Sequence, residues 1–234
     1  MGFKCGIIGL PNVGKSTIFN ALTESNKAEA ANYPFATIEP NIGRVPVPDE
    51  RLKILTDISK STNTIPTFID FVDIAGLVKG ASKGEGLGNK FLSHIREVDA
   101  IAHVVRCFED NDISHVSTKI NPKDDIEIIS TELKLADLET LQNKFVSLEK
   151  KSKSGDKIIK KQLDLLENLI SLLNENKKIN IKEYDKENNI FIKSLNLISN
   201  KPLLYICNVD EKSVVSGNKF SNIVKEIALN EKNE

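Results

Sequence analysis

A nine-residue stretch from Gly9 to Thr17 constrains this chain more than any other segment. It reads Gly-Leu-Pro-Asn-Val-Gly-Lys-Ser-Thr: a glycine, four residues, then Gly-Lys-Ser. An apolar run precedes it at 3–8 and a helix-like run follows at 17–22, which is the strand–loop–helix context of a phosphate-binding loop. Glycines let the backbone N–H groups turn inward as an anion-binding nest, and the helix adds its positive end. The stretch predicts a nucleoside triphosphate site, and this context disfavours the alternative of a plain glycine turn.

Six consecutive residues at the end of this stretch are assigned to nucleotide binding: Asn12, Val13, Gly14, Lys15, Ser16 and Thr17. The Lys15 ammonium is expected to reach the β- and γ-phosphates, so this residue is also a candidate catalytic group. The Ser16 hydroxyl is expected to ligate Mg²⁺. Together these assignments predict a Mg²⁺-dependent triphosphate site.

Strand-like and helix-like segments alternate along much of the chain. Apolar runs at 41–47, 66–74, 100–108 and 203–207 predict strands, and a short helix is expected around 49–59. Alternation of this kind around a phosphate loop predicts an α/β fold with a mainly parallel, doubly wound sheet. We therefore expect a P-loop NTPase domain.

Between 125 and 178 the pattern changes to that of long helices. Apolar positions recur every three or four residues in two stretches: Leu135, Leu138, Leu141, Phe145 and Leu148, then Ile159, Leu163, Leu166, Leu169, Ile170 and Leu173. A turn signal at 151–156 separates them, so the helices are expected to pack antiparallel as a coiled-coil hairpin. The predicted organisation is a nucleotide-binding domain of 1–124 and 201–234, interrupted by a helical insertion of 125–200.

Two further segments are candidates to complete the site. Asp73 ends an apolar strand and Gly76 follows it. This suits an acid that holds Mg²⁺ through water and a backbone N–H at the γ-phosphate; the alternative is a solvated aspartate at a strand end. Thr37 lies in a loop broken by prolines. It is a candidate Mg²⁺ ligand and catalytic residue when triphosphate is bound, and otherwise an ordinary loop threonine.

The composition fits a soluble, cytoplasmic protein. Of 234 residues, 32 are Lys or Arg and 33 are Asp or Glu, which gives a formal net charge of −1. Without a global basic field, any contact with nucleic acid must be local, and sequence readout of DNA is not expected. No apolar run approaches membrane-spanning length, and the N-terminus lacks the pattern of a secretory signal.

Several motifs carry a resemblance to a known family. They are the phosphate loop with Asn12, the segment 32–41 (Asn-Tyr-Pro-Phe-Ala-Thr-Ile-Glu-Pro-Asn), the segment 73–81 (Asp-Ile-Ala-Gly-Leu-Val-Lys-Gly-Ala) and the segment 84–92 (Gly-Glu-Gly-Leu-Gly-Asn-Lys-Phe-Leu). These motifs resemble those of the Obg-related P-loop proteins. The stretch 208–211, Asn-Val-Asp-Glu in place of Asn-Lys-x-Asp, narrows the resemblance to the YchF/Obg-like ATPase family.

The resemblance covers essentially the whole chain. It implies a translation-factor-type GTPase fold with a coiled-coil insertion, ATP hydrolysis and an association with ribosomes. A potassium ion beside Asn12, as in some related enzymes, is an open alternative. Family members continue into a further base-contacting loop and a small β-rich TGS domain, whereas this chain stops at Glu234. We therefore expect a fragment or a naturally short form, and the missing parts bear on nucleotide affinity and on stability.

The hydrolytic group is the least determined part of the predicted site. Ras-type enzymes orient the attacking water with a glutamine just after Asp-x-x-Gly, and here that residue is Leu77. Leucine cannot polarise water, so slow intrinsic turnover is expected unless another group acts. His115, in a polar loop after the strand of 100–108, lies on the ligand side of the predicted sheet and is the candidate. The alternative is a surface loop histidine.

The end of the last strand predicts which base is bound. Guanine presents two adjacent donors that the aspartate of Asn-Lys-x-Asp accepts, but here the carboxylate is Glu211, one methylene longer. Val209 replaces the lysine whose stem would cover the base, and Asn208 can accept from the adenine 6-amino group. We therefore expect ATP to be preferred over GTP. The alternatives are a polar loop without a base role, a GTPase of the Obg type, or a nucleotide-gated scaffold with negligible turnover.

Lysines crowd the turn of the predicted hairpin. The segment 144–161 contains seven lysines and two acidic residues. Like charges repel one another, so this arrangement adds nothing to the hairpin's own stability. A solvated tip is one explanation; a contact with phosphate backbone, of ribosomal RNA given the resemblance, is the functional one.

Overall fold

The computed structural model describes residues 2–24, 40–74, 76, 87–110, 113, 120–152, 156–231 and 233. The chain divides into two compact units: unit 1 comprises Met1–Val78, Glu97–Lys123 and Pro202–Glu234, and unit 2 comprises Lys79–Arg96 and Asp124–Lys201. The domain boundaries expected from the sequence (1–124, 125–200 and 201–234) stay a prediction.

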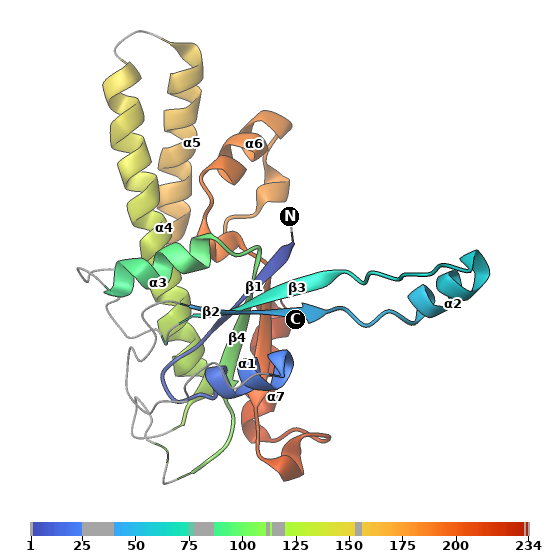
Figure 1. The fold of residues 1–234 in the computed structure, drawn as a ribbon. Coiled ribbons are helices and arrows are strands. Elements are labelled where there is room, and N and C mark those ends of the chain that lie inside the picture. Colours follow the sequence, from blue (N-terminus) through green and yellow to red (C-terminus); the bar gives the residue numbers. More distant parts are fainter. Residues whose placement is uncertain are drawn as a thin grey trace. The chain divides into compact units, whose positions relative to one another are not determined.

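Unit 1 is built on a five-stranded sheet with the order β2-β3-β1-β4-β5 (Figure 1). Its strands are β1 (Phe3–Ile8), β2 (Asn41–Pro46), β3 (Phe68–Asp73), β4 (Ala100–Arg106) and β5 (Leu203–Asn208). The pairs β1–β3, β1–β4 and β4–β5 are parallel, and β2–β3 is antiparallel. The predicted α/β fold with a mainly parallel sheet is confirmed.

The parallel pairing brings the ends of four strands to one edge of the sheet. Ile7 pairs with Asp73 across β1 and β3, and Arg106 pairs with Asn208 across β4 and β5. The segments that follow these strands therefore begin side by side, at the edge where ligands bind in folds of this class.

The helix between β2 and β3 explains why these two strands are antiparallel. α2 (Glu50–Ser59) lies at the end of an extension that leads away from the sheet (Figure 1). None of its residues is buried, and Ile54 and Ile58 are 59% and 74% exposed. A crossover helix between parallel strands would bury one face against the sheet. α2 does not, so the chain doubles back beside β3.

Two other helices of unit 1 flank the strands that form the site. α1 (Lys15–Thr23) follows the phosphate loop and buries Phe19. α7 (Lys219–Glu231) follows β5 and buries Val224 and Ala228. Apolar residues of β1 and β4, among them Ile7 and Val104, complete this core.

Unit 2 is helical where the structure describes it. It contains α3 (Leu87–Arg96), nearly all of α4 (Pro122–Ser152), α5 (Lys157–Asn174) and α6 (Lys186–Ser194). α4 and α5 lie side by side (Figure 1) and share a core with α6 and the segment after it. Its buried members are Leu141, Leu148, Leu165, Leu166, Leu169, Leu173, Ile179, Ile192, Leu195 and Leu197. Two packed helices are thus observed where the apolar repeat predicted them; the coiled-coil geometry stays a prediction.

A buried carboxylate fixes the return segment of unit 2. Asp137 of α4 is fully buried and accepts hydrogen bonds from the backbone N–H groups of Ile198 and Ser199, both at 2.8 Å. Burial raises the pKa of Asp137, and these hydrogen bonds oppose the rise.

Among the helices that the structure describes, none is long and apolar enough to cross a membrane.

Candidate nucleotide-binding site

The phosphate loop joins β1 to α1 and ends at a glycine with a left-handed backbone. Gly14 is the N-cap of α1 with φ of 96°, and Asn12 is also left-handed with φ of 61°. A Cβ atom on Gly14 would lie 2.4 Å from Nδ2 of Asn208. Only glycine fits this position, because a side chain would meet both backbone strain and a close neighbour. The loop therefore has the backbone shape that an anion site at the start of a helix requires, and the assignment of its residues to phosphate binding stays a prediction.

Lys15 lies inside this loop rather than in solvent. Its Nζ donates a hydrogen bond to the carbonyl of Leu10 at 2.8 Å, and the residue is 8% exposed. Burial lowers the pKa of Lys15 to about 8, although the charge of Asp73 opposes this effect. A buried ammonium is unfavourable until an anion joins it, so the site favours binding of a negatively charged ligand.

Ser16 and Asp73 meet at the start of α1. The Ser16 hydroxyl donates to Oδ2 of Asp73 at 2.9 Å, and Asp73 is 2% exposed. Burial raises the pKa of this carboxyl, while the Ser16 hydrogen bond and the Lys15 charge lower it. The sequence placed both residues in one metal site, and the structure brings them together across 57 positions of the chain.

This pair fits Mg²⁺ as P-loop proteins hold it. The described residues contain no cluster of three or more His, Cys, Asp or Glu side chains that could hold a metal without help. One hydroxyl and one carboxylate suit an ion that takes its other ligands from phosphate oxygens and water. When bound, Mg²⁺ would neutralise charge on the phosphates. The Ser16 hydroxyl would ligate it directly, and Asp73 would hold it through a water molecule.

Gly76 lies against the phosphate loop. A Cβ atom there would be 3.0 Å from Nζ of Lys15 and 3.2 Å from the backbone N of Pro11. The approach is tight for a side chain, so an added Cβ atom would require its neighbours to shift by a few tenths of an ångström. The role of the Gly76 backbone at a terminal phosphate stays a prediction. Three other residues of the predicted chemistry, Thr37, Leu77 and His115, lie outside the described residues.

The predicted base end of the site is joined to the phosphate loop by Asn208. Its Nδ2 donates to the carbonyl of Val13 at 3.0 Å. Val209 is half-buried, and the exposed Glu211 begins a short 3₁₀ turn, Glu211–Ser213, whose N-cap is Asp210. The structure thus brings Asn208 to the site. Among the described contacts the Glu211 side chain has no hydrogen bond, and only its backbone carbonyl accepts one, from the Val214 N–H.

Reasoning from the sequence missed Arg106, the last residue of β4. It is 1% exposed, and its guanidinium donates to three backbone carbonyls, those of Phe108, Asp110 and Ile113. It also lies over the Phe108 ring, 4.7 Å from the centroid. Arg106 therefore holds the segment that leads toward His115. The available signal was a charged residue inside an apolar run.

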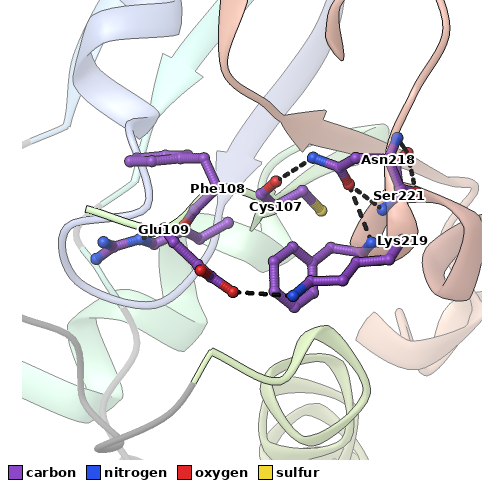
Figure 2. A network of polar contacts seen from close by, with 8 residues as sticks. Cys107, Phe108, Glu109, Asn218, Lys219 and Ser221 are labelled. Atoms are coloured by element: carbon purple, nitrogen blue, oxygen red, sulfur yellow. Dashed lines mark hydrogen bonds and ion pairs between the residues drawn. The ribbon is translucent and has the colours of Figure 1, made fainter. Parts of the chain in front are cut away.

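A second missed feature links the ends of β4 and β5 to α7 (Figure 2). Asn218 Nδ2 donates to the carbonyl of Cys107 at 2.7 Å, and Asn218 Oδ1 accepts from the backbone N–H groups of Phe220 and Ser221. Lys219 forms an ion pair with Glu109 at 3.1 Å. Nothing in the sequence pattern marked Asn218, because an asparagine before a helix is most often only a cap.

Comparison with known proteins agrees with this geometry. Residues 4–135 match the family model described as 50S ribosome-binding GTPase. Over 231 residues the chain is 55% identical to the ribosome-binding ATPase YchF of Haemophilus influenzae, covering 99% of this chain and 63% of that protein. The chain belongs to the YchF family.

Other YchF proteins give the same result. The ribosome-binding ATPase YchF of Bacillus subtilis is 50% identical over 236 residues, covering 100% of this chain and 64% of the relative. The solved structure of the Schizosaccharomyces pombe YchF GTPase matches with a TM-score of 0.78 at 39% identity, covering 100% of this chain and 63% of that one. The chain thus spans less than two thirds of the length of these YchF proteins.

Proposed function

We propose that this chain binds ATP with Mg²⁺, hydrolyses it slowly to ADP and phosphate, and acts as a nucleotide-dependent switch at the ribosome in the cytoplasm. The position of Lys15 supports the binding of a nucleoside triphosphate most directly. Its ammonium is buried in the phosphate loop beside Gly76 and is attracted by the charge of Asp73. Asp73 in turn accepts a hydrogen bond from the Ser16 hydroxyl. A buried cation beside a hydroxyl–carboxylate pair is the arrangement that a Mg²⁺-bound triphosphate completes.

The base is the point on which the names of similar proteins differ. The family model and the S. pombe structure are named GTPase, whereas the bacterial relatives are named ATPase. The residues support ATP. Because Nδ2 of Asn208 is engaged by Val13, the side chain presents Oδ1, an acceptor, which suits the adenine 6-amino group. Glu211 is longer than the aspartate that accepts both guanine donors.

We expect equilibrium titration to show tighter binding of Mg-ATP than of Mg-GTP. Mismatched polar groups at a base edge cost about 1–3 kcal/mol when buried, so the expected preference is on the order of tenfold or more. Equal or tighter binding of GTP would overturn the base assignment while leaving the triphosphate site intact. No binding of either nucleotide would overturn the proposed function.

Hydrolysis is proposed to be slow, because the position after Asp-x-x-Gly is Leu77. His115 stays the candidate for orienting water. Of the two described histidines, His103 is fully buried in β4, and burial together with the Lys15 charge lowers its pKa to about 3. His103 is therefore neutral at physiological pH and lies inside the sheet, which leaves it no part in proton transfer there.

The ribosome contact is proposed to lie at the ends of α4 and α5. Lys144, Lys150, Lys151 and Lys157 are all exposed there. Charge reversal at Lys150 and Lys151 should weaken ribosome association strongly, because each phosphate contact made by a lysine releases a counterion and makes binding steeply dependent on salt. Co-sedimentation with ribosomes at two salt concentrations measures the effect.

A matched control is charge reversal at Lys53 and Lys225, two exposed lysines of α2 and α7. It changes the net charge by the same amount on helices outside the hairpin and should leave co-sedimentation unchanged. ATP affinity should be unchanged in both double variants. If the Lys150/Lys151 variant sediments with ribosomes as the parent does, the contact lies elsewhere.

A further inference from the structure

Asn208, which we call the base-reading residue, lies at the end of β5, and a chain of hydrogen bonds joins this strand end to that of β4. Asn208 is held twice: its side chain donates to the Val13 carbonyl at 3.0 Å, and its own carbonyl accepts from the Cys107 N–H at 2.7 Å. The second bond lies one step past Arg106 and Asn208, the last residue pair of β4 and β5. The position of Asn208 therefore depends on where Cys107 lies.

Cys107 is in turn held by Asn218. Cys107 is 0% exposed, and a buried backbone carbonyl needs a hydrogen-bond donor. Strand pairing has ended at this point, and the donor is Nδ2 of Asn218 at 2.7 Å (Figure 2). The bond joins residues 111 positions apart.

The Asn218 amide is locked in one orientation. Its Oδ1 accepts from the N–H groups of Phe220 and Ser221, both at 3.0 Å, at the start of α7. Its backbone N–H donates to Oγ of Ser221 at 2.8 Å, and that hydroxyl donates back to the Asn218 carbonyl at 3.0 Å. With Oδ1 engaged by the helix, Nδ2 must face Cys107.

We propose that Asn218 is a positioning residue for the nucleobase: by fixing the Cys107 carbonyl it holds the backbone of Asn208 at the base end of the site. This inference rests on the proposed nucleotide function. Among the described residues Asn218 forms no hydrogen bond with Asn208 or with the phosphate loop, and it acts through Cys107. The nearby ion pair of Lys219 and Glu109 is exposed at both ends and contributes little.

The informative variant is Asn218→Asp. An aspartate keeps the oxygen that caps α7, and aspartate and asparagine cap helices equally well. It replaces the Nδ2 donor with an oxygen that faces the Cys107 carbonyl. Asn218→Ser also caps, but its side chain is too short for the bond to Cys107, and it adds no charge. Asp49→Ala removes the N-cap of α2, another helix of unit 1. It serves as the control for the loss of a helix cap that has no bond to Cys107.

The test measures the affinity of each full-length variant for Mg-ATP and for Mg-tripolyphosphate, which lacks base and ribose. Loss of one hydrogen bond to a buried carbonyl changes an equilibrium by about tenfold. We expect both Asn218 variants to bind ATP about tenfold more weakly and tripolyphosphate as the parent does, with Asp49→Ala unchanged for both ligands.

Two results would overturn the inference. Unchanged ATP affinity in the Asn218 variants shows that the bond does not position the base. Equal loss for ATP and tripolyphosphate shows a general structural effect. A parent that binds neither ligand overturns the proposed function itself, which distinguishes that failure from failure of this inference alone.

Discussion

Replacing Lys15 with methionine is expected to make the ligand-free protein more stable while abolishing triphosphate binding. Burial lowers the pKa of Lys15 from 10.5 to about 8, so the ammonium is less favourable in the fold than in the unfolded chain. At 1.36 kcal/mol per pKa unit, the cost near neutral pH is about 3 kcal/mol. Methionine has a similar length and no charge, so its free energy of unfolding should be higher by roughly that amount, less the lost hydrogen bond to Leu10.

The pH dependence of the stability difference between the parent and Lys15→Met shows whether the buried ammonium causes it. For a lysine with a lowered pKa, the destabilisation is fully present below the folded pKa of about 8 and is relieved as pH rises from 8 to 10.5. The parent should therefore gain stability relative to Lys15→Met across this range, and the difference should shrink. Denaturant unfolding at pH 7, 9 and 10.5 measures it.

The control for this substitution is Lys53→Met, at an exposed lysine of α2. Its stability should match that of the parent within about 0.5 kcal/mol at each pH, and its ATP affinity should not change. If the Lys15→Met protein were less stable than the parent at pH 7, the buried Lys15 ammonium would not destabilise the ligand-free fold, contrary to our expectation.

The second large effect is expected from Gly14→Ala. Alanine must adopt φ of 96°, and its Cβ would lie 2.4 Å from Nδ2 of Asn208. Strain of this kind costs about 1–3 kcal/mol, and relieving it moves both the phosphate loop and the base-reading residue. We expect a comparable loss of unfolding free energy and a fall in ATP affinity on the order of a hundredfold, since contacts at both ends of the ligand are displaced.

Gly2→Ala is the matched glycine control. A Cβ atom there would lie 3.4 Å from Oδ2 of Asp70, an ordinary van der Waals contact. Denaturant unfolding and ATP titration should both show this variant equal to the parent within about 0.5 kcal/mol. If Gly14→Ala retained the parent's ATP affinity, the loop would not need the observed backbone conformation.

The parts of the site that the sequence predicted share a physical reason. A phosphate loop is local, so its residues and spacing appear in one short stretch. Asp73 is distant in sequence, but parallel strands end at one edge of a sheet, and this places a carboxylate at the end of β3 beside the loop after β1. Asn208 follows the same rule at the end of β5.

The features that were missed depend on how segments pack rather than on a local pattern. The bond from Asn218 to Cys107 requires the start of α7 to pack beside the end of β4. The spacing of apolar residues in the sequence does not predict this packing. Arg106 reads as an interruption of an apolar run, yet it is buried because three carbonyls satisfy it. The antiparallel β2 follows from α2 projecting away from the sheet, which its helical pattern alone does not reveal.

We propose that this chain hydrolyses ATP at the loop around Lys15. Single-turnover measurement of phosphate release, with the protein in excess over Mg-ATP, tests it most directly. We expect a slow release that Lys15→Met reduces to the rate of buffer alone. Release of phosphate no faster than the buffer rate, from parent protein shown to be saturated with ATP, would contradict the claim and support a nucleotide-gated scaffold.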